Sequence, residues 1–300
     1  MNIALVVTGG SISSRIVNGE TVLSDAATAQ IASIVGATEV FDKFKIHSEG
    51  IEFEHLNTLR LTIEEALATN PDGVIVAHGT DTLAFSAAYL AYVFSGARVP
   101  IVMCSADLPL TDPESNGHAI LASAKTFLKN AKPGVYAVYR NAGSAVKVHH
   151  GARLLTAHIH EHFYFSIGDS SFSGTGLMRG MDFDLTGSPR VLCITPYIGL
   201  DYGAFDMKGC AAVVHTAYHS GRINAGAFNK FANEHKDIPM FLTAGQKKYG
   251  KNDFVPNIIQ CHGITPSALY IKVLIGLKNN VKDLTAFVMK NACGELVLGK

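Results

Sequence analysis

The sequence lacks an excess of either charge. Its 300 residues include 25 basic and 25 acidic side chains, so the formal net charge is zero. It contains no basic run and no basic patch interleaved with aromatic residues, the patterns that nucleic-acid binders show. We therefore expect a small-molecule partner and no nucleic-acid partner.

The sequence also lacks an apolar run long enough to cross a membrane. The longest one, near residues 83–94, is too short for a bilayer. The N-terminal segment 1–5 has no positively charged region and continues directly into a strand pattern. These observations predict a cytoplasmic protein with no membrane partner.

Closely spaced cysteines are absent as well. The five cysteines form no C-x-x-C pair and are Cys104, Cys193, Cys210, Cys261 and Cys293. Their odd number and wide spacing argue against a disulfide framework or a four-cysteine metal site. We expect buried free thiols.

What the sequence does contain is a regular alternation of strand and helix patterns. Hydrophobic residues make up 48% of the chain, enough for a sizeable core, and the length suggests two domains. The expected strands in the first half are 3–7, 39–46, 74–77, 99–104 and 135–139, and the expected helices are 25–35, 53–69, 82–95 and 114–130. This order predicts a doubly wound α/β sheet.

A second, smaller α/β unit is expected to follow. Residues 169–180 are rich in serine and glycine, and a G-S-P turn at 187–189 completes a linker, so we place the domain boundary near residue 187. Beyond it, the expected strands are 191–195, 211–215 and 240–243, and the expected helices are 225–234 and 266–277.

Two loops at strand ends carry the chemistry. T-G-G-S at residues 8–11 and H-G-T-D-T at 78–82 each place a hydroxyl beside glycine, which allows close approach of the main chain to a ligand. Thr80 and Asp81 are expected to cap the helix that follows, whose N-terminus favours an anion or a developing oxyanion. Such an edge suits attack of a hydroxyl on an acyl carbon. Neither loop has a dinucleotide or P-loop pattern, so no such cofactor is expected.

Other sequence motifs show a resemblance to a known family. T-G-G-S-I at 8–12, D-G-V-I-V-A-H-G-T-D-T-L at 72–83 and S-A-D at 105–107 resemble the two signature motifs and a companion loop of the bacterial L-asparaginases. G-I-T-P-S-A at 263–268 is similar to the C-terminal segment of that family, so the resemblance extends over the whole chain.

The resemblance implies a flavodoxin-like N-terminal domain, residues 1–187, and a smaller α/β C-terminal domain, residues 188–300. Members of the family hydrolyse L-asparagine, and sometimes L-glutamine, to the acid and ammonia through a hydroxyl nucleophile, without a cofactor or metal. The resemblance also implies a homodimer or homotetramer with active sites between protomers.

The resemblance assigns roles residue by residue. Ser11 falls on the nucleophilic threonine of the family, keeping the hydroxyl but losing the methyl group that restricts χ1. Thr80 matches the second catalytic threonine, and Asp81 matches the aspartate that binds the α-amino group of the substrate. The expected substrate-binding residues are Ser48, Glu49, Gly79 and Ser105.

The sequence departs from the family pattern at two places. Counting without gaps from Gly151 puts Thr156 where the catalytic lysine of the family stands, and a neutral hydroxyl cannot serve as the base. His158 or Lys147 are possible replacements. The polar stretch 13–24, expected to be a mobile loop over the pocket, contains no tyrosine, although many family members use a lid tyrosine there.

Two other functions remain open from the sequence. In the first alternative, which these departures favour, the chain is a catalytically silent relative that binds an amino acid as a sensor or partner subunit. Alternatively, His158, His160 and His162 project from one face of an extended segment, a pattern that can bind zinc, although no carboxylate or thiolate stands at ligand spacing. An amidotransferase subunit that acts on charged tRNA is a variant of the hydrolase, but the chain lacks an added RNA-binding domain and a basic face.

Overall fold

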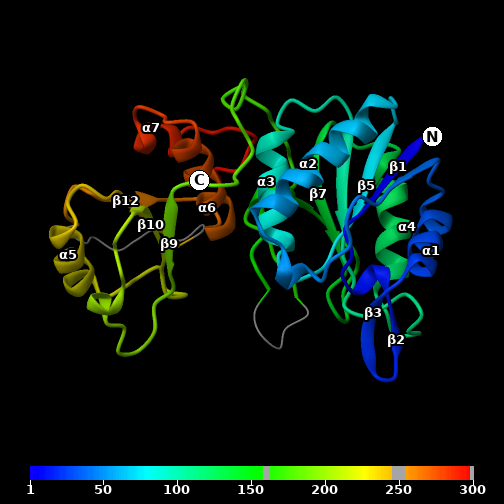
Figure 1. The fold of residues 1–300 in the computed structure, drawn as a ribbon, viewed down its shortest axis with the longest axis horizontal. Helices are drawn as coiled ribbons and strands as arrows, with labels where there is room; N and C mark the ends of the chain where they lie inside the picture. The colour runs from blue at the N-terminus through cyan, green and yellow to red at the C-terminus, as the bar shows by residue number, and fades with distance from the viewer. Residues whose placement is uncertain (158–162, 245–253, 298–300) are drawn as a thin grey trace.

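Two sheets, one mostly and one wholly parallel, organise the computed structural model, which describes residues 1–157, 163–244 and 254–297 (Figure 1). The first sheet has the order β4-β1-β5-β6-β7-β8, and only β8 is antiparallel to its neighbour. Its strands are β1 (Ile3–Val7), β4 (Glu39–Phe41), β5 (Gly73–Ala77), β6 (Pro100–Cys104), β7 (Gly134–Tyr139) and β8 (Lys147–His150). The expected doubly wound α/β fold is confirmed.

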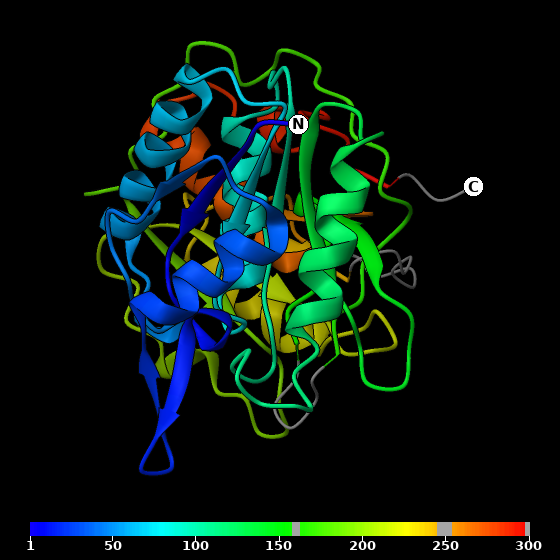
Figure 2. The ribbon, with the colours of Figure 1, turned by 90° about the vertical axis from the view of Figure 1, so that its right-hand side faces the viewer.

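Helices cover both faces of this sheet (Figures 1 and 2). They are α1 (Asp25–Val35) and α4 (Gly117–Leu128) on one face, and α2 (Phe53–Ala68) and α3 (Leu83–Val93) on the other. Because both faces are covered, the central strands are apolar throughout; every residue of β1, β5, β6 and β7 is buried.

The second sheet is parallel throughout and has the order β12-β11-β10-β9. Its strands are β9 (Arg190–Ile194), β10 (Cys210–Thr216), β11 (Met240–Thr243) and β12 (Ile258–Cys261), and its helices are α5 (Ala225–Glu234), α6 (Pro266–Lys278) and α7 (Leu284–Val288). Helix α6 lies between the two sheets and contacts α3, where the Tyr92 hydroxyl donates to the Ala268 carbonyl at 3.1 Å (Figure 1). Residue 187 lies between β8 and β9; the domain boundary there stays a prediction.

The stretch 13–24 differs from its expectation, because it forms a β-hairpin rather than an irregular loop. Strands β2 (Ser14–Val17) and β3 (Glu20–Leu23) pair antiparallel and extend away from the first sheet (Figure 2). Asn18 and Gly19 both have positive φ, 52° and 84°, as a tight two-residue hairpin turn requires. The N-G dipeptide was the sequence signal for this turn.

Smaller corrections concern strands and thiols. The expected strand 39–46 ends at Phe41, and the sequence analysis missed β8, β12 and α7. All five cysteines are free, but Cys193 is exposed, so the expectation of buried thiols is wrong for that residue. None of the helices in the described ranges is both long and apolar enough to cross a bilayer.

A buried ion pair connects α6 to the C-terminal segment. Lys272 and Glu295 are both fully buried, and their side chains lie 2.5 Å apart. The carboxylate also accepts from the main-chain N–H groups of Ala292 and Cys293. Burial alone would raise the pKa of Glu295, but Lys272 and these N–H groups together lower it. The Glu295 carboxylate is therefore held in its charged form, and both of its oxygens accept hydrogen bonds.

Breaking this pair is expected to destabilise the fold. Glu295→Gln leaves the Lys272 charge without a counterion in an apolar site, which typically costs about 3–5 kcal/mol. Urea unfolding followed by circular dichroism measures the loss. Glu65→Gln is the matched control, because Glu65 pairs with Lys43 at 3.2 Å with both side chains half exposed, and a change below about 1 kcal/mol is expected. Equal losses in the two variants would contradict the prediction.

Candidate functional site

A small polar cavity of about 190 Å³ lies at the carboxyl edge of the first sheet. It sits where the strand order reverses between β1 and β5, the position at which such sheets usually bind ligands. Its lining residues come from four separate segments and are Gly10, Ser11, Thr21, His47, Ser48, Glu49, Gly79, Thr80 and Asp81. The structure thus brings together six of the seven residues that the sequence analysis selected.

The loop that carries Ser11 and the loop that carries Thr80 touch through their glycines. A Cβ atom added to Gly10 would lie 2.2 Å from the Cα atom of Gly79, so only glycine permits this approach. Gly10 also has φ of +75°, a conformation that favours glycine. This contact holds both hydroxyl-bearing loops at the same cavity.

Ser48 forms hydrogen bonds with the loop that carries Thr80 and Asp81. Its Oγ accepts a hydrogen bond from the Asp81 N–H at 3.0 Å and donates to the Asp81 carboxylate at 3.2 Å. The Thr82 hydroxyl donates to the Ser48 carbonyl at 3.0 Å. A Cβ atom on Gly79 would lie 2.4 Å from the Ser48 Oγ, so this packing too requires glycine. These bonds fix the Asp81 carboxylate at the cavity.

The predicted helix cap is wrong. Helix α3 begins at Leu83 with Thr82 in the N-cap position, and no side chain makes a capping hydrogen bond there. Asp81 does not cap the helix because its carboxylate is oriented toward Ser48 instead. Thr80 and Asp81 therefore contribute to the lining of the cavity and not to the end of the helix.

Ser105 is the one selected residue that lies outside the cavity. It is fully buried behind the loop, with its Oγ 2.5 Å from the His78 carbonyl oxygen and 2.9 Å from that of Gly79. The structure thus places Ser105 as a support of the main chain beneath Thr80.

His78 supports the same loop from inside. Its side chain is completely buried, and Nδ1 lies 2.7 Å from the Gly79 carbonyl oxygen. Burial lowers the pKa of His78 to about 4, because the low-dielectric interior disfavours the imidazolium. The imidazole is therefore neutral at pH 7, and Nδ1 carries the proton that it donates to Gly79.

Tyr164 is a neighbour of the site that the sequence analysis missed. Its hydroxyl donates to the Thr80 carbonyl, and its ring packs edge-on against Tyr139 with centroids 4.7 Å apart. Asn141 accepts from the Tyr164 N–H at 2.8 Å and donates to the Tyr164 carbonyl at 3.0 Å. Tyr164 is thus held by Thr80, Tyr139 and Asn141. Because Tyr164 and Thr80 are 84 positions apart in the sequence, no local pattern predicts their contact.

Thr21 and His47 also line the cavity without having been selected. Thr21 lies on β3, so identification of the hairpin from its N-G turn would have brought it toward the site. His47 directly precedes Ser48 in the H-S-E-G segment.

Of the residues discussed for the role of the family's lysine, Thr156 and Lys147 lie among the described residues. Both are exposed and line no part of the cavity. His158, His160 and His162 lie outside the described residues. Across the described ranges, no lysine or arginine lines this cavity, and no group of three side chains with metal-ligand chemistry occurs.

The geometry defines a doubly wound α/β protein with a hydroxyl-lined cavity at the topological switch point. A family model described as "Asparaginase, N-terminal" matches residues 2–168, more than half of the sequence. The chain belongs to the asparaginase family, which confirms the resemblance seen in its motifs.

Individual relatives agree with this assignment. L-asparaginase of Thermococcus kodakarensis is 30% identical over 164 residues, which cover 53% of this chain and 48% of that protein. A subunit of the glutamyl-tRNA(Gln) amidotransferase of Methanopyrus kandleri is 30% identical over 173 residues, covering 52% of this chain and 37% of that protein. The match therefore spans about half or less of these relatives.

Solved structures share the fold over the full length. The thermostable L-asparaginase from Thermococcus kodakarensis has a TM-score of 0.77 at 22% identity, covering 100% of both chains. A probable cytoplasmic L-asparaginase from Campylobacter jejuni has a TM-score of 0.76 at 20% identity, covering 97% of this chain and 99% of the other.

The buried His78 makes stability dependent on pH. Its pKa is about 4 in the folded protein against 6.5 as the ordinary value, so the folded state resists protonation. The stabilisation is complete above pH 6.5 and is lost as the pH falls toward 4, by up to about 3 kcal/mol. We expect His78→Asn to reduce the fall in Tm between pH 6.5 and 4, measured by calorimetry. His219→Gln, at an exposed histidine, should leave the slope unchanged; an unchanged slope in His78→Asn would contradict the prediction.

Proposed function

We propose that the chain is an asparaginase-type amidohydrolase that cleaves L-asparagine, or a related small amide, to the acid and ammonia. The observation that carries this proposal is the meeting of Ser11 and Thr80 at one cavity beside the fixed carboxylate of Asp81. A volume of about 190 Å³ is below the range typical of drug-sized ligands and suits a small amino acid.

The reaction follows the chemistry of the lining residues. The Ser11 oxygen attacks the side-chain amide carbon and gives its proton to a base, forming a tetrahedral oxyanion. Main-chain N–H groups near Ser11 and Thr80 stabilise that charge. The C–N bond then breaks, the departing nitrogen takes up a proton to leave as ammonia, and water hydrolyses the ester to release the acid and restore Ser11. Asp81 binds the α-amino group by charge.

The base differs from that of the family. Thr156 lies outside the cavity, and the Asp81 carboxylate is assigned to the α-amino group. The imidazole of His47 and the carboxylate of Glu49 are therefore the other groups in the lining that can act as general bases. We assign proton transfer to this pair. Ser48 orients Asp81, and Gly79 allows the close approach of the two loops.

Assembly and location follow from the same proposal. We infer a homodimer or homotetramer, in keeping with the assembly that the resemblance to the asparaginase family implies. We also infer a cytoplasmic location, in line with the structural neighbour from Campylobacter jejuni, a probable cytoplasmic L-asparaginase.

A catalytically silent amino-acid binder is the second candidate. The specific observation in its favour is the absence of a lysine from the cavity lining in the described ranges, combined with a hairpin that contains no tyrosine. The relative from Methanopyrus kandleri is one subunit of an amidotransferase, so a partner subunit is part of this alternative.

Removing either hydroxyl is expected to abolish turnover. Ser11→Ala loses the nucleophile, and Thr80→Val loses the second hydroxyl, so ammonia release from asparagine should fall by about 10³-fold or more in each variant. A coupled ammonia assay measures the rate. Ser33→Ala, at an exposed serine of α1, is the matched control and should keep full activity. Undiminished turnover in both site variants would overturn the proposed hydrolysis.

Ammonia release, measured together with the effect of aspartate on the Tm, separates the two candidate functions. For the hydrolase, aspartate should raise the Tm of wild-type protein while asparagine is turned over. For the silent binder, it should raise the Tm with no ammonia released. Failure of both asparagine and aspartate to shift the Tm would exclude both candidates.

Tyr164 is expected to act as a positioning residue. Tyr164→Phe removes the hydrogen bond to the Thr80 carbonyl, worth about 1 kcal/mol, and should lower kcat by up to about fivefold with little change in KM. Steady-state kinetics with asparagine measure both constants.

Tyr136→Phe is the matched control, because it loses a similar bond, to the Lys132 carbonyl at 3.0 Å, elsewhere in the fold. It should change neither constant. A similar fall in kcat in both variants would show that Tyr164 contributes only to general stability.

A further inference from the structure

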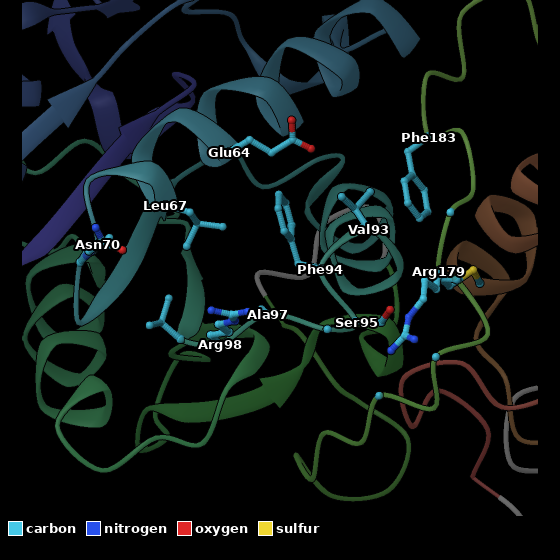
Figure 3. Close-up of a pocket in the computed structure, with 17 residues that line it drawn as sticks. Glu64, Leu67, Asn70, Val93, Phe94, Ser95, Ala97, Arg98, Arg179 and Phe183 are labelled. Carbon is cyan, nitrogen blue, oxygen red and sulfur yellow. The ribbon is translucent and has the colours of Figure 1, made fainter.

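A groove much larger than the candidate active site lies at the opposite edge of the first sheet. Its volume is about 930 Å³, within the upper range of small-molecule sites. It is formed by the chain around Asn70 that leads into β5, by the turn that follows α3, and by residues 174–183 of the connection to the second sheet (Figure 3). It shares no lining residue with the cavity that holds Ser11 and Thr80.

The walls of the groove are held together by main-chain contacts. A Cβ atom on Gly174 would lie 1.9 Å from the Ser95 carbonyl oxygen, so these two backbones touch. The Tyr89 hydroxyl of α3 donates to the Phe183 carbonyl at 2.9 Å and fixes the far end of the same wall. The groove is therefore preformed rather than a gap between independent segments.

Two guanidinium groups give the groove a positive charge. Arg98 and Arg179 lie on the two sides of Ser95 (Figure 3), both are exposed, and neither forms an ion pair with a described residue. The carboxylate in the lining, Glu64, already pairs with Arg60 at 2.8 Å. The two unpaired arginines suit an anion, and their planar forks match phosphate oxygens.

Apolar and aromatic surface lies next to these charges. Phe94 and Phe183 flank Val93 at the end of α3 (Figure 3), but Phe94 and Met178 are buried in the core, whereas Phe183 and Leu67 are only partly buried and offer the accessible apolar surface. Aromatic rings offer a surface against which a flat ring packs. A ligand that satisfies both parts of the groove combines an anionic group with a flat or apolar body.

We propose that this groove binds a nucleoside phosphate, with the phosphates at Arg98 and Arg179 and the base against the Phe183 side chain. The volume accommodates a molecule of that size, whereas aspartate would leave most of the groove empty. The missing P-loop and dinucleotide motifs do not oppose this, because the groove lies away from the carboxyl edge of the sheet where those motifs act.

Isothermal titration of the full chain with ATP, AMP, adenosine and inorganic phosphate tests the proposal without reference to amide hydrolysis. ATP and AMP should bind measurably below about 1 mM, and adenosine and phosphate at least about tenfold more weakly, since each offers only one of the two chemistries. No heat with either nucleotide at about 1 mM, or equal binding of adenosine and ATP, would overturn it.

Variants locate the binding. The double variant Arg98→Ala/Arg179→Ala should weaken ATP binding at least about tenfold, whereas Arg98→Lys/Arg179→Lys should keep part of the affinity because the charge remains. Arg222→Ala is the matched control, at an exposed arginine near the second sheet, and should bind as wild type. Circular dichroism and the Tm without ligand confirm that each variant is folded. An equal loss in Arg222→Ala would assign the affinity to general charge and overturn the site.

Discussion

The contact between Gly10 and Gly79 is the constraint on which the candidate site depends. The two residues follow different strands, and their backbones approach so closely that a single added carbon atom would collide. Parallel strands bring their carboxyl ends to one edge, where the Thr8 N–H donates to the Ala77 carbonyl at 3.0 Å. The glycine contact then holds the loops of Ser11 and Thr80 against each other. The surrounding bonds, from Ser48 and Ser105, then stiffen a loop whose place is already determined.

Much of the first sheet was predictable because its chemistry is local. Strands such as Ile3–Val7 are continuous apolar runs, and α1 ends at Gly36, whose φ of +69° is the expected left-handed stop. Most residues facing the cavity, though not Thr21 or His47, were predictable for a related reason, since hydroxyls beside glycine at strand ends meet at one edge. The motifs that resemble the family identified those same residues.

The rest depended on partners that are distant in sequence. The role of Ser105 as a support, and the bond from Tyr164 to Thr80, exist only once β5, β6 and the segment after β8 are assembled. Asp81 was expected to cap a helix because the local pattern suits a cap, but the tertiary contact with Ser48 prevailed. The hairpin differs from these cases because its signal is local. The N-G dipeptide indicates a tight turn, but the polar composition of residues 13–24 favoured the interpretation as a loop.

The β2–β3 hairpin supplies one wall of the cavity through Thr21, yet it is a two-stranded ribbon with Ile16 and Val22 about half exposed. Ribbons of this kind gain little from burial, so they open locally at a far smaller free-energy cost than a central strand does. Amide hydrogens of the hairpin should therefore exchange with solvent long before those of β1 or β5. The cavity is therefore rigid where Gly10 and Gly79 meet, and it opens transiently at the wall that Thr21 supplies.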